Sequence, residues 1–274
     1  MNPEGLLELE RWFERYVAGF TTCEGTDDYV HRNLKSRYEH IMRTREEMAL
    51  LCEKLQLNPQ RRLICDAIAL LHDVGRFEQF VQYRTFNDHV SVNHGTLGIS
   101  ILRREAILAS LPAQEQYAIE TAIAGHNLKQ MPKDLSGDAL LFTRLIRDAD
   151  KIDILYCSVH YFQQYRQDPL SVDLELEFSD APSCTPEVVA AILAGQQVPY
   201  DRLETLHDLQ LLQLGWVYDV NFQATLERLQ QRGLLDQLLD FLPAGPDRTR
   251  VGWHVRAYVQ SHLQRSLSLS QSLS

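Results

Sequence analysis

The chain has 274 residues, 45% of them hydrophobic, which is enough material for one large domain or two small ones around a packed core. Its 37 acidic residues outnumber its 27 basic residues, giving a formal net charge of −10. This balance argues against nucleic acid as a partner, because binding a phosphate backbone requires a basic surface. A small phosphorylated substrate remains compatible, since one pocket can be locally positive inside an acidic protein.

Cysteine usage and hydropathy predict a cytoplasmic protein. The five cysteines include no CxxC pair, so neither a zinc ribbon nor a disulfide framework is expected. The first twenty residues carry charges among their apolar positions and do not resemble a signal peptide. No apolar run approaches the roughly 20 residues that a membrane span needs, and we therefore expect no membrane association.

Apolar residues recur at helical spacing through most of the chain, which predicts an all-α fold. The segment from Arg62 to Gly75 is apolar nearly all round and should form a central buried helix that ends near Gly75. Residues 76–88 show no steady period and are expected to form a loop, and residues 168–184 an irregular excursion. The other predicted helices cover residues 6–20, 38–55, 93–111, 114–125, 138–166, 186–195, 200–241 and 248–266.

A His-Asp pair, His72-Asp73, ends the most apolar of these helices. Burying an imidazole beside a carboxylate is costly unless something pairs with them, and a divalent metal ion does so well. The chain contains a second such pair, His207-Asp208, with no recognisable partners around it. We interpret that second pair as a surface or helix-capping pair.

Further candidate ligands flank the first pair at a distance. His40 lies upstream, with Arg43 one helical turn later. Asp150 lies downstream in the long helix, where Ile146 and Ile154 at i−4 and i+4 place it on a buried stripe. One imidazole, a His-Asp pair and a late carboxylate could complete one octahedral metal site.

The order of His40, His72-Asp73 and Asp150 resembles the HD-domain superfamily of metal-dependent phosphohydrolases, over roughly residues 28–165. Arg43 at i+3 from the first histidine, Gly75 and Arg76 after the His-Asp pair, and an Ala-Asp-Lys context for the last aspartate agree with that family. Asp148 is the alternative to Asp150, although the family pattern favours the aspartate directly before the lysine. The resemblance implies an HD-domain helical bundle around a metal site.

The resemblance also suggests a second metal ion. His94 and His126 fall between Asp73 and Asp150, in the order of family members in which two further imidazoles serve a second ion and the aspartate bridges both. His89 is the alternative to His94, and two ordinary histidines near helix ends are the alternative to a second ion. The implied cofactor is one or two divalent ions of Mn, Fe, Ni, Co, Zn or Mg.

Four basic residues lie within four residues of a proposed ligand and could bind phosphate: Arg43, Arg76, Lys129 and Lys151. Arginine offers a bidentate fork and lysine a point charge to phosphate oxygens. Each could instead be a surface charge or a helix-end salt bridge, and Lys151 could bond loop carbonyls. We predict Asp73, Arg43 and Lys151 as catalytic residues, and Arg76 and Lys129 as binding residues.

The resemblance implies hydrolysis of a phosphate ester or phosphoanhydride bond by metal-activated water. Arg43 would stabilise the developing charge, and Asp73 would hold metal and accept the proton of the water. The substrate would be a small phosphorylated molecule such as a nucleotide, cleaved by a phosphomonoesterase, phosphodiesterase or nucleotidase activity. The alternatives are a mixed-valence di-iron oxygenase of the same superfamily and a non-catalytic ligand-binding or regulatory module.

The predicted domain organisation follows these motifs. Residues 1–27 should hold an N-terminal helix packed on the core, and residues 28–166 the metal-binding catalytic domain. Residues 167–266 should form a C-terminal helical extension that could close the pocket or provide a homodimer interface. The tail, residues 267–274, is of low complexity and is expected to be disordered.

Overall fold

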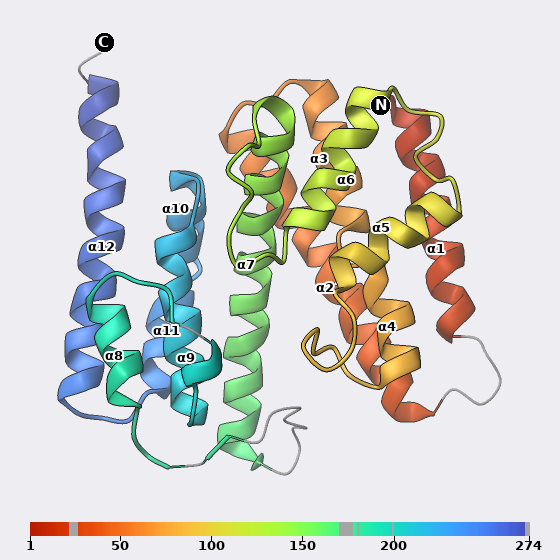
Figure 1. Cartoon of the computed structure of the whole chain (residues 1–274). Helices are drawn as coiled ribbons and strands as arrows, with labels where there is room; N and C mark the ends of the chain where they lie inside the picture. Colours follow the sequence, from red (N-terminus) through yellow and green to blue (C-terminus); the bar gives the residue numbers. More distant parts are fainter. Residues whose placement is uncertain (22–26, 170–177, 180, 199, 272–274) are drawn as a thin grey trace. The chain divides into compact units, whose positions relative to one another are not determined.

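A computed structural model describes residues 1–21, 27–169, 178–179, 181–198 and 200–271, with side chains up to residue 264. The described residues form helices, and their one β-type pairing is an isolated bridge between Ser179 and Thr205. The predicted all-α fold is therefore confirmed (Figure 1). None of the described helices combines the length and the apolar composition that a bilayer span requires.

The chain divides into two compact units, Met1–Asp153 and Ile154–Ser274. The division lies inside a long helix, earlier than the boundary after residue 166 that the sequence suggests. The first unit contains α1 (Pro3–Thr21), α2 (Asp28–Lys54), α3 (Pro59–Leu71), α4 (Gly75–Tyr83), α5 (His94–Arg104), α6 (Ala113–Gly125) and the first half of α7 (Gly137–Gln167).

Side-chain caps fix where the helices of the first unit begin. Asp27 accepts a hydrogen bond from the backbone N–H of Val30 at the start of α2, and Asn58 accepts one from Arg61 before Pro59 opens α3. At the start of α5, Asn93 accepts a bond from the backbone N–H of Thr96. That cap makes His94 the first residue of its helix.

The core of the first unit centres on α3. Its residues from Ala67 to Leu71 are all buried, as the apolar sequence predicts. Its end differs from the prediction, however, because α3 stops at Leu71 and Gly75 begins α4. The loop expected over residues 76–88 is also wrong for most of its length, since Phe77 and Phe80 bury one face of α4 in the core.

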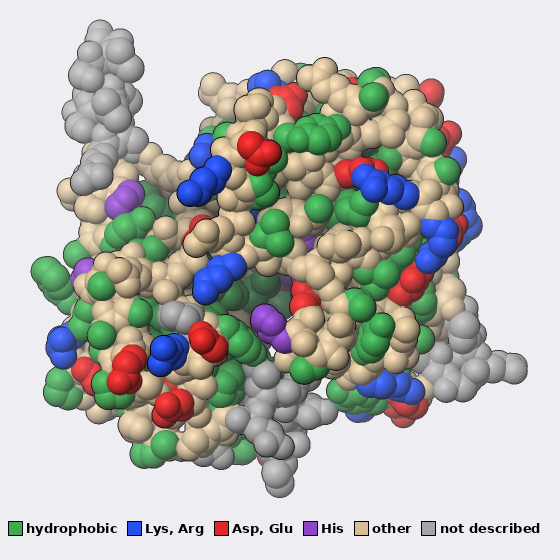
Figure 2. Space-filling model, in the orientation of Figure 1, with side chains coloured by type: hydrophobic (Ala, Val, Ile, Leu, Met, Phe, Trp, Pro, Cys, Tyr) green, Lys and Arg blue, Asp and Glu red, His purple; other side chains and the backbone are tan. Residues whose placement is uncertain are grey.

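Helix lengths differ from the prediction at two other places in the first unit. The helix expected from residue 38 begins a full ten residues earlier, at Asp28, where Asp27 caps it. The helix expected over residues 93–111 ends at Arg104, and Ala106 behind it has a positive φ of 52°, which an α-helix does not allow. Acidic and basic side chains lie next to one another on the face of this unit in Figure 2.

The second unit contains the end of α7, α8 (Pro186–Leu193), η2 (Tyr200–Arg202), α9 (Leu206–Leu214), η3 (Gly215–Asp219), α10 (Gln223–Gln231), α11 (Leu234–Phe241) and α12 (Pro246–Gln271). The helix expected over residues 200–241 is thus a series of shorter pieces. Helix α12 extends through Gln271, into the tail expected to be disordered, and the last three residues lie outside the described part. Most of the excursion expected at residues 168–184 also lies outside it.

Candidate metal centre

A first group of ligand atoms is formed by His40 on α2, His72 and Asp73 directly after α3, and Asp150 on α7. The Nε2 atom of His40 lies 3.1 Å from Oδ1 of Asp150 and 3.4 Å from Nε2 of His72. The Nε2 atom of His72 lies 3.8 Å from the same Asp150 oxygen. Both imidazoles are almost completely buried, so the group lies inside the first unit.

A second group is formed by His94 at the start of α5 and His126 at the end of α6. Their Nε2 atoms lie 2.9 Å apart. Oδ1 of Asp73 lies 3.3 Å from Nε2 of His94 and 3.6 Å from Nε2 of His126. These three side chains are also buried.

Asp73 belongs to both groups. While its Oδ1 faces the second group, its Oδ2 lies 3.6 Å from Nε2 of His40 and 3.7 Å from Nε2 of His72. Burial raises the pKa of this carboxyl, but the positive charge of Arg37, whose Nη1 lies 2.8 Å from Oδ2, outweighs burial and holds the pKa well below its ordinary value. Asp73 is therefore ionised, with one oxygen directed to each group.

The imidazoles of His72 and His126 are oriented by backbone carbonyls. Nδ1 of His72 lies 2.8 Å from the carbonyl oxygen of Ala69, and Nδ1 of His126 lies 2.6 Å from that of Ile123. A carbonyl oxygen only accepts, so each Nδ1 carries the hydrogen. Burial lowers the pKa of His72 to about 4, which leaves the ring neutral at pH 7 with a bare Nε2 lone pair.

The imidazoles of His40 and His94 are oriented by carboxylates. Nδ1 of His40 donates to Oδ2 of Asp153 at 2.7 Å, and Nδ1 of His94 donates to Oδ2 of Asp88 at 2.7 Å. Burial raises the pKa of Asp153, but bonds from His40 and Arg43 bring it below the ordinary value. Burial also lowers the pKa of His94 to about 4.

These hydrogen bonds leave the four Nε2 atoms directed at one another and at carboxylate oxygens. The Nε2 atoms of His94 and His126 lie 2.9 Å apart, and two neutral rings that donate through Nδ1 would meet there with lone pairs alone, which is a repulsive contact. A cation removes the repulsion, and imidazole with carboxylate is a donor set that suits divalent Zn, Mn, Fe, Co or Ni. The residues therefore fit one or two divalent ions.

The structure brings all six sequence-predicted ligands together, in the order that the motif suggests. Among the described residues, close ligand groups include His40, His72 and Asp150, and also His72, Asp73 and His126. The alternatives are not part of these groups: His89 is exposed on the segment before α5, and the buried Asp148 belongs to neither of them.

The two predicted phosphate-binding arginines contact carboxylates. Arg43 places Nε 2.7 Å from Oδ1 of Asp153 and Nη2 3.1 Å from Oδ2, so these two donors hold the Asp153 carboxylate. Arg76 places Nη1 2.9 Å from Oδ1 of Asp88. Lys151 is half-buried beside Asp150, and Lys129 is exposed three residues after His126.

Sequence reasoning missed the arginine that contacts the shared aspartate. Nη1 of Arg37 lies 2.8 Å from Oδ2 of Asp73, and its guanidinium lies over the ring of Phe86, 4.6 Å from the centroid. Arg37 precedes His40 by three residues on α2, so it shares a helix face with that ligand. Its spacing from His40 was the signal that could have found it.

The glycine after the His-Asp pair allows α4 and α5 to approach closely. A Cβ at Gly75 would lie 2.2 Å from the carbonyl oxygen of His94 and 2.8 Å from the backbone nitrogen of Gly98. No side chain fits at that position without moving α5. The glycine therefore lets His94 lie beside Asp73.

The second His-Asp pair is a helix cap, as predicted. Asp208 accepts bonds from the backbone N–H and the hydroxyl of Thr185, at 2.8 and 2.6 Å, and from the backbone N–H of Thr205, at 3.0 Å. With Thr205 it forms the capping box of α9. Donors of the chain itself satisfy this carboxylate.

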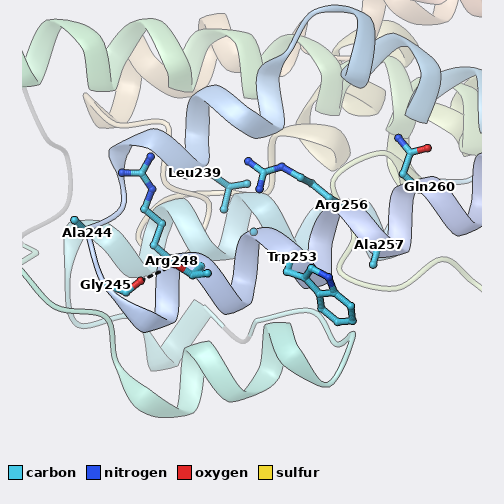
Figure 3. A pocket seen from close by; sticks show the side chains of 10 residues that line it. Leu239, Ala244, Gly245, Arg248, Trp253, Arg256, Ala257 and Gln260 are labelled. Carbon is cyan, nitrogen blue, oxygen red and sulfur yellow. Dashed lines mark hydrogen bonds between the residues drawn. The ribbon is translucent and has the colours of Figure 1, made fainter.

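A pocket in the second unit lies on α11 and α12 (Figure 3). Its lining includes Leu239, Gly252 and the exposed Trp253 but no imidazole or carboxylate. Arg256, also in the lining, pairs with Asp236 on α11. The pocket offers no metal ligands, so the candidate centre is the buried cluster of the first unit.

Comparison with known families agrees with this geometry. Residues 37–155 match the family model described as the HD domain, a range that contains all six clustered ligands. The matched segment, residues 37–155, is therefore an HD domain. No match was found among curated proteins or among solved structures.

Proposed function

We propose that the protein is a metal-dependent phosphohydrolase that binds two divalent ions, one at each ligand group. The observation that carries the proposal is the shared Asp73 carboxylate, which directs one oxygen to each group. The match to the HD domain supports the same reaction class, since HD domains are largely metal-dependent phosphohydrolases. The substrate class we propose is a small phosphate ester or anhydride, such as a nucleotide.

Each residue has a distinct task in this proposal. His40, His72 and Asp150 would hold one ion, His94 and His126 would hold the other, and Asp73 would contribute to both groups. When bound, such ions lower the pKa of a coordinated water toward about 7 and neutralise charge on phosphoryl oxygens. Arg37 donates to Oδ2 of Asp73 and keeps that carboxylate ionised and in place.

Two further roles stay predictions from the sequence. Lys151, directly after Asp150, is proposed to contact the substrate phosphate, and Lys129 to contribute to its binding. The guanidinium groups of Arg43 and Arg76 bind Asp153 and Asp88, which favours a supporting role for both arginines over direct contact with phosphate. Replacing Lys151 by Met and measuring KM for a phosphate ester tests the first role.

The test of the function combines metal analysis with a screen for phosphate release. Freshly purified protein should contain close to two divalent ions per chain and release phosphate from at least one nucleotide or phosphate ester. Asp73→Ala should lose both ions and all turnover. Asp208→Ala is the matched control, because it alters the other His-Asp pair and should retain the ions.

The alternatives give different results in the same experiment. Stoichiometric iron with substrate-dependent consumption of oxygen, and no phosphate release, would establish the di-iron oxygenase. Ligand binding without turnover of any tested substrate would favour the regulatory module. Full phosphate release by metal-depleted Asp73→Ala protein would end the proposal.

A further inference from the structure

Each ligand group contains one imidazole held by a backbone carbonyl and one held by a carboxylate. We infer that Asp153 and Asp88 are positioning residues, and that each serves one group: Asp153 orients His40 in the first, and Asp88 orients His94 in the second. The inference rests on the proposed function only in requiring that ions bind to the two groups. It does not depend on the reaction catalysed.

Asp153 is held firmly enough to fix an imidazole. It is fully buried on α7, one turn after the ligand Asp150. One edge of its carboxylate receives Nε and Nη2 of Arg43, and Oδ2 also accepts from Nδ1 of His40 at 2.7 Å. Such a bidentate pair restricts rotation of the carboxylate, so the His40 ring keeps its Nε2 directed at the first group.

Asp88 is held by a larger set of donors. Its oxygens accept from Arg76 and Gln79, each at 2.9 Å to Oδ1, and from Asn127 at 3.0 Å to Oδ2. Gln79 is completely buried and donates also to the hydroxyl of Ser91 and the carbonyl of Val92. These bonds hold the segment between α4 and α5, and with it the oxygen that receives Nδ1 of His94.

Asp153 and Asp88 contact different ligand groups, so the loss of either carboxylate should affect metal binding at one group only. Asp153 contacts His40 and Arg43, which belong to the first group and its surroundings. Asp88 contacts His94 and Arg76 near the second group. An Asn at either position keeps the shape but removes the negative charge and turns an N–H₂ group toward a donor. Loss of such a partner typically costs 10–100-fold in metal affinity.

The experiment measures each group in a background that disables the other. His126→Ala removes a ligand of the second group and leaves every ligand of the first group in place. Asp150→Ala removes a ligand of the first group and leaves every ligand of the second group in place. Titration of the metal-free proteins with Co²⁺, followed by its visible absorption, gives the affinity and the coordination spectrum of the remaining group.

We expect Asp153→Asn to weaken Co²⁺ binding 10–100-fold in the His126→Ala background, whereas Asp88→Asn changes it by less than about twofold. In the Asp150→Ala background the order should reverse. Equal losses from both substitutions in both backgrounds, or no loss from either, would overturn the inference. Arg43→Gln provides a milder second variant and should weaken the first group only.

Two controls keep the test interpretable. Circular dichroism and the melting temperature of each metal-free variant show that it folds, because an unfolded variant would lose binding in both backgrounds alike. Selective loss of Co²⁺ without any phosphate release would support the inference and contradict the proposed reaction alone. Failure of the unmodified protein to bind Co²⁺ would overturn both.

Discussion

Replacing Gly75 by Ala should damage the second ligand group more than the first. The added Cβ would lie 2.2 Å from the carbonyl oxygen of His94, where ordinary contacts begin near 3.4 Å, so the two helices must separate by about 1 Å. The added Cβ would also lie 2.8 Å from the backbone nitrogen of Gly98, so a small sideways shift of α4 would not relieve the clash. Because the displaced carbonyl belongs to His94 itself, its imidazole should move away from Asp73.

The energetic cost follows from two opposing effects. Overpacking of a tight interior typically costs about 1–3 kcal/mol. Removing a glycine from a helix recovers about 0.5–1 kcal/mol. The added Cβ meets backbone atoms, which cannot rotate away, so the overpacking cost should lie in the upper part of its range, at about 2–3 kcal/mol. The net loss should then be about 1–2.5 kcal/mol, which lowers the melting temperature by a few degrees in a protein of this size.

The assay is thermal melting of the metal-free protein together with metal quantification. Gly75→Ala should melt a few degrees lower and lose at least tenfold in affinity for one ion while keeping the other. Gly19→Ala is the matched control, because a Cβ there meets nothing within 4 Å, and it should be neutral or slightly stabilising. Unchanged melting and two tightly bound ions in Gly75→Ala would refute the reasoning.

Three other perturbations test separate parts of the structure. Asp208→Asn should lower the free energy of unfolding by about 2 kcal/mol, measured with denaturant, without affecting bound metal. Hydrogen bonds outweigh burial and lower the pKa of Asp208. The difference in unfolding free energy between the unmodified protein and the variant should therefore be largest above pH about 5 and shrink as the pH falls through the pKa of the folded protein. Arg147→Met should weaken the second group and cost about 2–3 kcal/mol, because Nη1 of Arg147 donates to the carbonyls of Gly125, His126 and Leu128 behind α6; normal metal binding would contradict this. Chelation with EDTA should lower the melting temperature of the unmodified protein, since an ion at 100 times its Kd adds about 2.7 kcal/mol; identical melting curves with and without chelator would argue against occupied sites.

The ligands could be predicted from sequence because their chemistry is conspicuous. An imidazole-carboxylate pair at the end of an apolar helix needs a partner, and Asp150 lies on a buried stripe that is visible from its i±4 neighbours. The all-α fold followed from the helical period in the same way. The residues alone did not show that the six ligands come together in space. The resemblance to a family predicted this, and the structure places them together.

The surrounding contacts were less accessible for identifiable reasons. Asp88 lies in an irregular segment with no period, so nothing in the sequence shows that it folds back onto His94. The loop prediction over residues 76–88 failed because the aromatic residues there are interspersed with polar and charged ones, although Phe77 and Phe80 are one helical turn apart. Asp153 was within reach, because it follows Asp150 by three residues and therefore shares its helix face.

The two arginines near the ligands illustrate a related limit. Position along the chain showed that Arg43 and Arg76 lie near ligands, and both were expected to bind phosphate. Position could not show that a buried carboxylate lies within hydrogen-bond distance of each, at 2.7 and 2.9 Å. An interior carboxylate needs such a partner more than a solvated substrate does, because an unpaired buried charge is costly.

The two His-Asp pairs of this chain separate the motif from the site. Both aspartates are buried, and burial alone would raise the pKa of each, yet both carboxyls are ionised. Asp208 accepts hydrogen bonds from backbone N–H groups and a hydroxyl, so donors of the chain balance its negative charge without a metal ion. Asp73 instead faces imidazole nitrogens whose hydrogens are directed elsewhere, so its own environment contains more acceptors than donors. This excess of hydrogen-bond acceptors over donors around Asp73, and not the His-Asp sequence itself, indicates a metal centre. A search for His-Asp pairs alone would rank His72-Asp73 and His207-Asp208 equally.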